Sequence, residues 1–240
     1  MATLSSTQFG ALTTDQVKAL TTAQAAQLTS TQTVGLTSTQ AGVMTGADLA
    51  KLSTTALSSM TTAAFSAVAA SEITSLSSGQ VSALQGAQVT ALTTAQAAVL
   101  TSTQTPGLTS SQTSSIETQD LAALTTSASA ALTTGVVSSL SSTQMGALTS
   151  EQVTALTTAQ AAALTSTQAV GLTTSQAAGL ESGDLNKLTT GAFAAIDPSV
   201  TAKLSGTQVG ALTTAQITAL TTAQAAALTS TQAAGITTSQ

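Results

Sequence analysis

Acidic side chains at a fixed spacing are the best candidates for chemistry in this sequence. Three segments pair an acid with a second charged residue three positions away: Glu117 with Asp120, Glu181 with Asp184 and Lys187, and Asp48 with Lys51. Paired carboxylates could hold a divalent cation or share acid–base work. Calcium, however, takes about six to eight oxygen ligands, which one acid pair does not supply. We therefore interpret these acids as favourable charge at helix N-termini and as solubilising surface groups.

The residue types that carry most enzyme chemistry are missing from this chain. It contains no His, Cys, Trp or Tyr, and its three aromatic residues are all Phe. Nucleophilic catalysis needs a nucleophile beside a general base, and His and Cys are the commonest choices for these roles. The sequence therefore predicts a protein that is not an enzyme, with no catalytic, cofactor-binding or metal-binding residue.

Charge and hydropathy exclude two further classes of partner. The net charge is −5 and the only basic residues are four scattered lysines, whereas nucleic-acid binding depends on clustered Lys and Arg. No apolar run approaches the ~20 residues that span a bilayer. We expect neither nucleic-acid binding nor membrane insertion. The first residues also lack the pattern of a signal peptide, and the repeat described next breaks off at Gln240, so we expect a fragment of a longer protein.

A period of eight residues runs through the whole sequence without insertion or deletion. Every eighth residue from Leu4 to Ile236 is apolar, which defines thirty octads. The octad reads Leu-(Thr/Ser)-(Thr/Ser)-x-Gln-(apolar or small)-x-(Ala/Gly). A longer period of eight octads lies over it, because LTTAQAA recurs at 20, 92, 156 and 220, and the first copy has one octad more. Residues 1–240 are thus predicted to form one repeat domain whose units contact mainly their neighbours.

The polar positions of the octad predict a short helix in every copy. Position two is usually Ser or Thr, and position five is Gln in twenty of thirty octads, which is the spacing of a capping box. At Asp197 and Pro198 different residues fit the same register, with Asp as N-cap and Pro at the first helical position. Pro106 limits the helical part of its octad to about one turn. The predicted fold class is all-α, an elongated superhelical solenoid with one short capped helix for each octad.

Three other folds compete with this one. A continuous helix is disfavoured because eight residues advance the Leu position by ~80° beyond two turns, so the apolar stripe would wind around the axis. A β-solenoid is disfavoured because Ala and Gln are poor strand residues and the sequence lacks period-two alternation. Disorder is common in Ser/Thr/Ala-rich chains, but thirty apolar residues in phase argue against it.

Positions one and six are expected to form the inner face of the solenoid. Position six alternates along each long repeat between bulky and small residues, and the small half contains octads that end in glycine: Gly35, Gly107, Gly171 and Gly235. Because small residues allow backbones to approach closely, these glycines are a candidate strip for lateral contact between molecules. Tapering of the core is the alternative explanation.

The segment LTTAQITALTTAQ at residues 212–224 resembles the tandem Ala/Thr/Gln-rich arrays of very long bacterial surface or secreted proteins of adhesin-like type. The resemblance covers essentially the whole chain, and no binding or catalytic residue is attached to it. It implies an extracellular or cell-surface location and a role as stalk, spacer, adhesive or matrix segment.

The sequence therefore predicts a structural spacer or adhesive segment of a larger extracellular assembly. Its terminal octads are ordinary repeat sequence, without the polar capping units of natural solenoids, so we expect self-association, end to end or laterally, into dimers or filaments. Two alternatives remain open: an array that binds a ligand or ice through its Thr/Ser hydroxyls, and a designed consensus repeat protein.

Overall fold

A computed structural model describes residues 3–236, and within this range the chain is entirely helical. It has 26 short α-helices, three 3₁₀-helices and no strand. Each of the 29 octads between Leu4 and Gly235 holds one of these helices, which confirms the predicted all-helical repeat. The thirtieth octad lies, apart from Ile236, outside the described residues.

The chain divides into two compact units, Met1–Ala131 (unit 1) and Leu132–Gln240 (unit 2), and the boundary coincides with an octad boundary. Each unit is described by itself. The helices of unit 1 are α1 (Ser6–Gly10), α2 (Thr14–Lys18), α3 (Thr22–Ala25), α4 (Ser30–Thr33), α5 (Ser38–Ala41), α6 (Gly46–Leu49), α7 (Thr54–Ser58), α8 (Thr62–Ser66), α9 (Ala70–Ile73), α10 (Ser78–Ser82), α11 (Gly86–Thr90), α12 (Thr94–Ala98), η1 (Thr105–Gly107), η2 (Thr113–Ser115), α13 (Thr118–Ala123) and α14 (Thr126–Ala130).

Unit 2 repeats the same pattern. Its helices are α15 (Thr134–Ser139), α16 (Ser142–Ala147), α17 (Ser150–Thr154), α18 (Thr158–Ala162), α19 (Ser166–Ala169), η3 (Ala177–Gly179), α20 (Ser182–Leu185), α21 (Thr190–Ala194), α22 (Pro198–Thr201), α23 (Gly206–Gly210), α24 (Thr214–Thr218), α25 (Thr222–Ala227) and α26 (Ser230–Gly235). Every α-helix described in either unit begins at position three of its octad.

Position two is the N-cap, as the sequence predicts. In α18 the hydroxyl of Thr157 accepts from the backbone N–H of Gln160 at 3.2 Å, and the side-chain oxygen of Gln160 accepts from the N–H of Thr157 at 2.8 Å. This reciprocal pair satisfies two donors that a helix start otherwise leaves unpaired. Asp197 caps α22 in the same place and is followed by Pro198 as the first helical residue, so the predicted register is confirmed where the sequence departs most from the repeat.

The three 3₁₀-helices fall in octads whose sixth position is small. Pro106 lies inside the first of them, Thr105–Gly107. A proline has no N–H to donate and disfavours a longer α-helix, which agrees with the single turn predicted there. The other two, η2 and η3, lack proline and are equally short.

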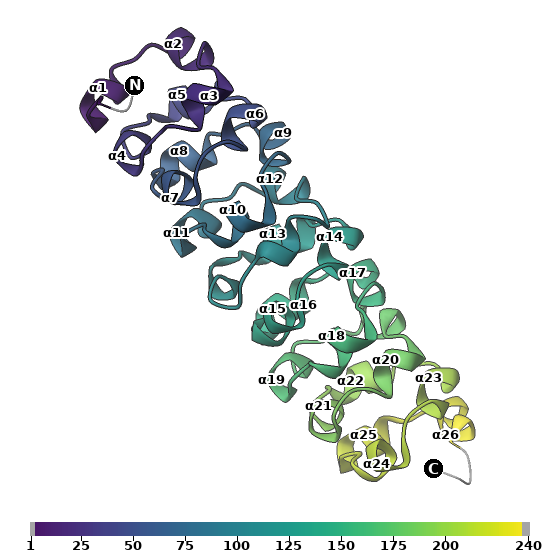
Figure 1. Ribbon diagram of the computed structural model, residues 1–240. Helices are drawn as coiled ribbons and strands as arrows, with labels where there is room; N and C mark the ends of the chain where they lie inside the picture. Colours follow the sequence, from purple (N-terminus) through teal and green to yellow (C-terminus); the bar gives the residue numbers. More distant parts are fainter. Residues whose placement is uncertain (1–2, 237–240) are drawn as a thin grey trace. The chain divides into compact units, whose positions relative to one another are not determined.

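Within each unit, octads pack against the octad three places further along the chain. In Figure 1 this brings α1 beside α4 and α4 beside α7 in unit 1, and α23 beside α26 in unit 2. The side chains at positions one and six fill the space between these neighbours, as predicted. Phe9, Phe65 and Phe193 all stand at position six and are no more than 1% exposed.

The glycines at the ends of the small octads lie at this packing interface. An added Cβ at Gly107 would overlap with the backbone of Ser78, three octads earlier in unit 1, and one at Gly171 would overlap with Ser142 in unit 2. Only glycine permits such a close approach of two backbones. The lateral-contact hypothesis is therefore wrong for these residues, because their free side is used for packing inside each unit.

The cap predicts a difference between two positions of one helix. Replacing Thr157 by Ala removes the hydroxyl that accepts from Gln160 and should lower the free energy of unfolding by roughly 0.5–2 kcal/mol. Replacing Ala159, which is exposed at position four, by Ser should change it by less than about 0.5 kcal/mol. Chemical denaturation followed by circular dichroism compares the two; equal small effects would contradict the capping role.

Two glycines allow a similar test of the close packing. Gly107→Ala should destabilise unit 1 by about 1–3 kcal/mol or more, since the methyl group must displace backbone. Gly191→Ala should leave unit 2 unchanged or raise its stability by up to about 1 kcal/mol, because nothing lies within 4 Å of the added atom and Ala favours the helix. Thermal unfolding of both variants tests this, and tolerance of Ala at Gly107 would refute the packing interpretation.

Candidate functional site

The acids selected from the sequence are not gathered into a reactive site. Among residues 3–236 no three acidic, His or Cys side chains come together in a way that could hold a metal ion. The structure corrects one interpretation. Asp48, Asp120 and Asp184 are 3%, 2% and 8% exposed, so these three are buried groups and do not serve as surface charge. Glu181 and Lys187 are exposed, as expected.

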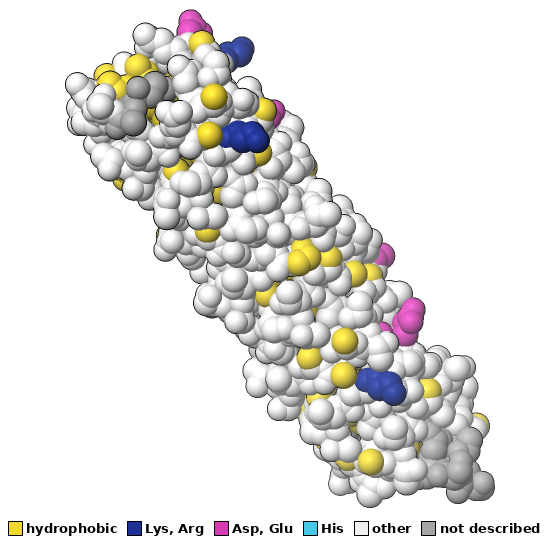
Figure 2. All heavy atoms as spheres, viewed as in Figure 1, with side chains coloured by type: hydrophobic (Ala, Val, Ile, Leu, Met, Phe, Trp, Pro, Cys, Tyr) yellow, Lys and Arg dark blue, Asp and Glu magenta, His cyan; other side chains and the backbone are white. Residues whose placement is uncertain are grey.

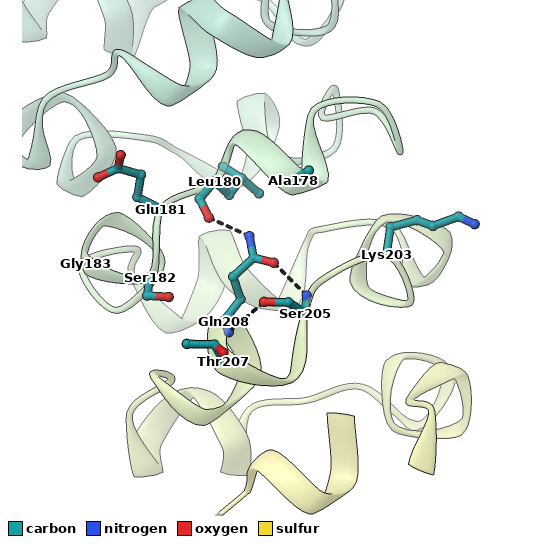
Figure 3. A pocket seen from close by; sticks show the side chains of 9 residues that line it. All are labelled: Ala178, Leu180, Glu181, Ser182, Gly183, Lys203, Ser205, Thr207 and Gln208. Carbon is teal, nitrogen blue, oxygen red and sulfur yellow. Dashed lines mark hydrogen bonds between the residues drawn. The ribbon is translucent and has the colours of Figure 1, made fainter. Parts of the chain in front are cut away.

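An open depression of about 610 Å³ lies in unit 2, between the octads that hold α20 and α23. Figure 3 shows Glu181 and Lys203 on opposite sides of it, with the Lys203 side chain directed away from the Glu181 carboxylate. The floor is Gln208, which donates to Leu180 O at 2.6 Å and accepts from the N–H of Ser205 at 2.6 Å. Its lining has Ser, Thr, Lys and Glu side chains but no His or Cys, and the Ser205 hydroxyl accepts from the backbone N–H of Gln208 at 3.1 Å.

The contact on that floor is the chemical feature that recurs most among the described residues. Gln96 shows it in unit 1: its side-chain nitrogen donates to Phe65 O at 3.2 Å and to Val68 O at 2.8 Å, 31 and 28 residues earlier. Its side-chain oxygen accepts from the N–H of Thr93 at 2.9 Å. One amide thus caps its own helix and binds the octads that lie three and four places earlier in the chain.

We call this repeated contact the glutamine ladder. In each contact, or rung, the side chain of a position-five glutamine donates to two backbone carbonyls, with the spacing seen at Gln96. One carbonyl is at position six of the octad four places earlier, and the other is at position one of the octad three places earlier. In unit 1 the described members are Gln40, Gln80, Gln88, Gln96, Gln104 and Gln112. In unit 2 they are Gln176, Gln208, Gln216, Gln224 and Gln232, and Gln160 and Gln168 each show one such bond within the unit.

The glutamine side chains of the ladder are buried. Gln96, Gln176 and Gln216 are each 1% exposed. The amide nitrogen and the amide oxygen of such a side chain both have partners, and a buried carbonyl without a donor would cost about 1–3 kcal/mol. The ladder therefore holds octads that are three and four places apart in the chain at a fixed distance and in a fixed register.

Two octads with Ala at position five use another link. In unit 1 the hydroxyl of Thr33 donates to Ala56 O at 2.6 Å, and that of Thr105 donates to Ala128 O at 2.7 Å. Both acceptors stand at position five, where Ala replaces Gln. A buried threonine three octads earlier thus supplies the hydrogen bond between turns that the alanine side chain cannot make.

Sequence reasoning assigned position five to capping and missed its second role. A signal for that role was present. A capping box accepts Glu as readily as Gln, yet Glu occurs at position five only once, at Glu72, against twenty glutamines. A position that needs only an acceptor would tolerate both residues, so the near exclusion of Glu indicates that the amide must donate.

Figure 2 shows a face on which charged side chains are few and separate and hydrophobic ones are scattered. The large apolar side chains that stand out among the described residues are Val34 and Val170, 48% and 61% exposed. None of the helices in residues 3–236 has the length and apolar character needed to cross a bilayer.

Comparison with known families finds a match to one repeat family over part of the chain. Residues 113–150 and 130–158 match the family described as the ALTTAQ repeat, so the chain is similar to tandem repeat proteins of that type. No curated protein and no solved structure gave a significant match.

The ladder predicts a strong effect of one carboxylate. Gln96→Glu keeps the oxygen that accepts from Thr93 but replaces the donating amide by negative charge against Phe65 O and Val68 O. At pH 7 it should lower the free energy of unfolding by about 3–5 kcal/mol. The control is Gln16→Glu, whose side chain is exposed and makes the local cap; it should change stability by less than about 0.5 kcal/mol. Similar losses in urea denaturation would mean that the donated bonds contribute nothing.

Proposed function

We propose that this protein is a non-enzymatic structural spacer or stalk, an adhesive or matrix segment of a larger bacterial surface or extracellular assembly. The observation that supports this most is the glutamine ladder. It joins each octad to earlier octads through backbone carbonyls. Because every residue has a backbone carbonyl, more octads can be added to the array without a new kind of interface. Proteins that only need to span distance benefit from such nearest-neighbour stability.

An elongated superhelical solenoid is the form that we propose for the array. Packing between octads three apart, repeated along each unit, adds material along one direction, since each octad contacts only near neighbours. The thinly charged, hydroxyl-rich surface suits an extended segment that remains soluble. The extracellular location is supported by the resemblance to bacterial surface arrays, and the repeat character by the match to the ALTTAQ repeat.

The same ladder suggests how the chain associates with itself. Gln8, Gln16 and Gln24 are exposed, unlike the buried glutamines of the ladder. By analogy with the other rungs, their side-chain N–H groups face the position that a preceding turn would occupy. We propose that the last turn of a second copy supplies the carbonyls, which gives head-to-tail association.

The hydroxyl-array alternative receives less support. Position-two hydroxyls, such as those of Thr157 and Thr213, accept hydrogen bonds from the backbone of their own helices. A hydroxyl engaged in a cap is less available to organise water or a ligand. The capping role therefore favours a structural array over an ice-binding one, and a thermal hysteresis measurement would detect ice binding directly.

Head-to-tail association predicts a mass that depends on concentration. In sedimentation experiments over about a hundredfold range of concentration, the average mass of the wild type should rise from monomer to dimer and beyond. The double variant Gln16→Glu, Gln24→Glu keeps both caps but replaces the amide donors by carboxylates, and should stay monomeric at the same concentrations. A monomeric wild type would refute self-association, and equal association of both proteins would refute the ladder as its basis.

A further inference from the structure

Asp120 occupies a ladder position without being able to make ladder bonds as a carboxylate. It stands at position five of its octad, so the spacing seen at Gln96 assigns to it the carbonyls of Val89 and Leu92. Both oxygens of its carboxyl group are buried and have no hydrogen-bond partner among the described residues. An ionised acid has only acceptors and would face two more acceptors.

A small apolar cavity adjoins the acid and those two residues. Its volume is about 20 Å³, and its wall includes Val89, Leu92, Ala97, Ile116 and Asp120 itself. This is room for about one water molecule. Val89 and Leu92, whose carbonyls a glutamine would reach, line this cavity together with the shorter Asp side chain. Desolvation of a charge in such a place is costly.

The described surroundings of Asp120 hold no positive charge to offset that cost. The side chains of α12, against which α13 packs, are uncharged, and so are the other described residues that line the cavity. The charged neighbour is Glu117, on the same octad, whose carboxylate accepts from Gln119 at 2.6 Å. Burial raises the pKa of Asp120 above its ordinary value of 3.8; the nearby Thr94 hydroxyl partly offsets this, and the negative charge of Glu117 adds to it.

The equivalent acid of the first long repeat shows what Asp120 lacks. Asp48 is also at position five and buried, but the hydroxyl of Thr45 at its N-cap donates to it at 2.7 Å. In the octad of Asp120 the N-cap is Glu117, which makes no side-chain cap. The two octads therefore give the same residue different neighbours: a hydroxyl that donates to Asp48, and a second carboxylate beside Asp120.

We propose that folded unit 1 binds a proton at Asp120 more tightly than the unfolded chain does, so that an uncharged carboxyl group takes the place of the ladder amide. The neutral acid avoids placing a desolvated charge beside this apolar cavity. This proton site is independent of the spacer function. It makes the packing between the octads of Val89 and Asp120 depend on pH.

The sign of the pH dependence follows from the raised pKa. The folded state holds the proton at pH values where the unfolded chain has released it, so folding stability from this group is fully present below about pH 3.8. It is lost as the pH rises through the higher pKa of the folded state. Glu151 and Asp197 have pKa values lowered by hydrogen bonds, from the Glu151 backbone and Thr149 and from Ser199 respectively, and act in the opposite sense, losing their contribution as the pH falls.

The test compares full-length wild type with Asp120→Asn, which keeps the shape of the side chain and donates at every pH. The ratio of their folding equilibrium constants, wild type over variant, should fall several-fold between pH 4 and pH 8; effects of all other acids cancel in this ratio. Asp15→Asn, at an exposed acid, is the control and should show no such fall. A ratio that is constant or rises with pH would overturn the proposal.

A second measurement follows the protonation of Asp120 directly. Carbon NMR of the side-chain carboxyl groups should show one that titrates above the ordinary range and disappears in Asp120→Asn. Glu117→Thr recreates the Thr45 arrangement and should lower the midpoint of that titration. Asp120→Gln should fill the cavity and raise stability more at pH 8 than at pH 4. A carboxyl group that titrates at or below pH 3.8, or a midpoint that Glu117→Thr leaves unmoved, would show that Asp120 is not a proton site.

Discussion

The hydrogen bonds from buried glutamine side chains to the backbone of the preceding turn are the interaction on which the rest of the structure depends. The apolar side chains are mostly Ala, Leu and Val, so burial alone contributes modestly for each octad. A side chain such as Gln96 adds two bonds between turns and one within its own helix start. Because the same amide makes all three, one side chain links the cap of its own helix to the packing between octads.

This arrangement explains how the first long repeat accommodates an additional octad. Ladder bonds join position five to positions six and one of earlier octads at constant separations. Gln80 and Gln96 keep the same spacings on both sides of the 52–59 segment, the simplest candidate for the additional octad. After an insertion of one whole octad, each position-five side chain again lies against carbonyls at positions six and one. A shorter insertion would place side chains of the wrong type against those carbonyls. The unbroken period of thirty octads is therefore a physical requirement of the ladder.

Backbone acceptors also make the array tolerant of its own side-chain variation. Position six changes from Phe193 to Thr201 in adjacent octads without change in the ladder spacing, since the carbonyl that accepts is present in both. Where a rung changes, the structure compensates locally: Thr105 donates to the backbone of an octad that has Ala at position five. At Asp120 the nearby Thr94 hydroxyl compensates only in part, so protonation of this residue has a consequence that the glutamine rungs do not share.

The local structure could be predicted from residue types alone, because capping involves atoms only a few residues apart: the position-two hydroxyl, the Gln three residues later and the Asp197–Pro198 variant mark where each helix begins. The apolar period likewise identifies positions one and six as the inner face. Which octads pack against that face could not be predicted, because capping does not determine how many octads separate two packed helices. The partners of Gln96, the contact of Gly107 with Ser78 and the burial of Asp120 beside α12 all depend on that one long-range separation, which only the packed turns establish.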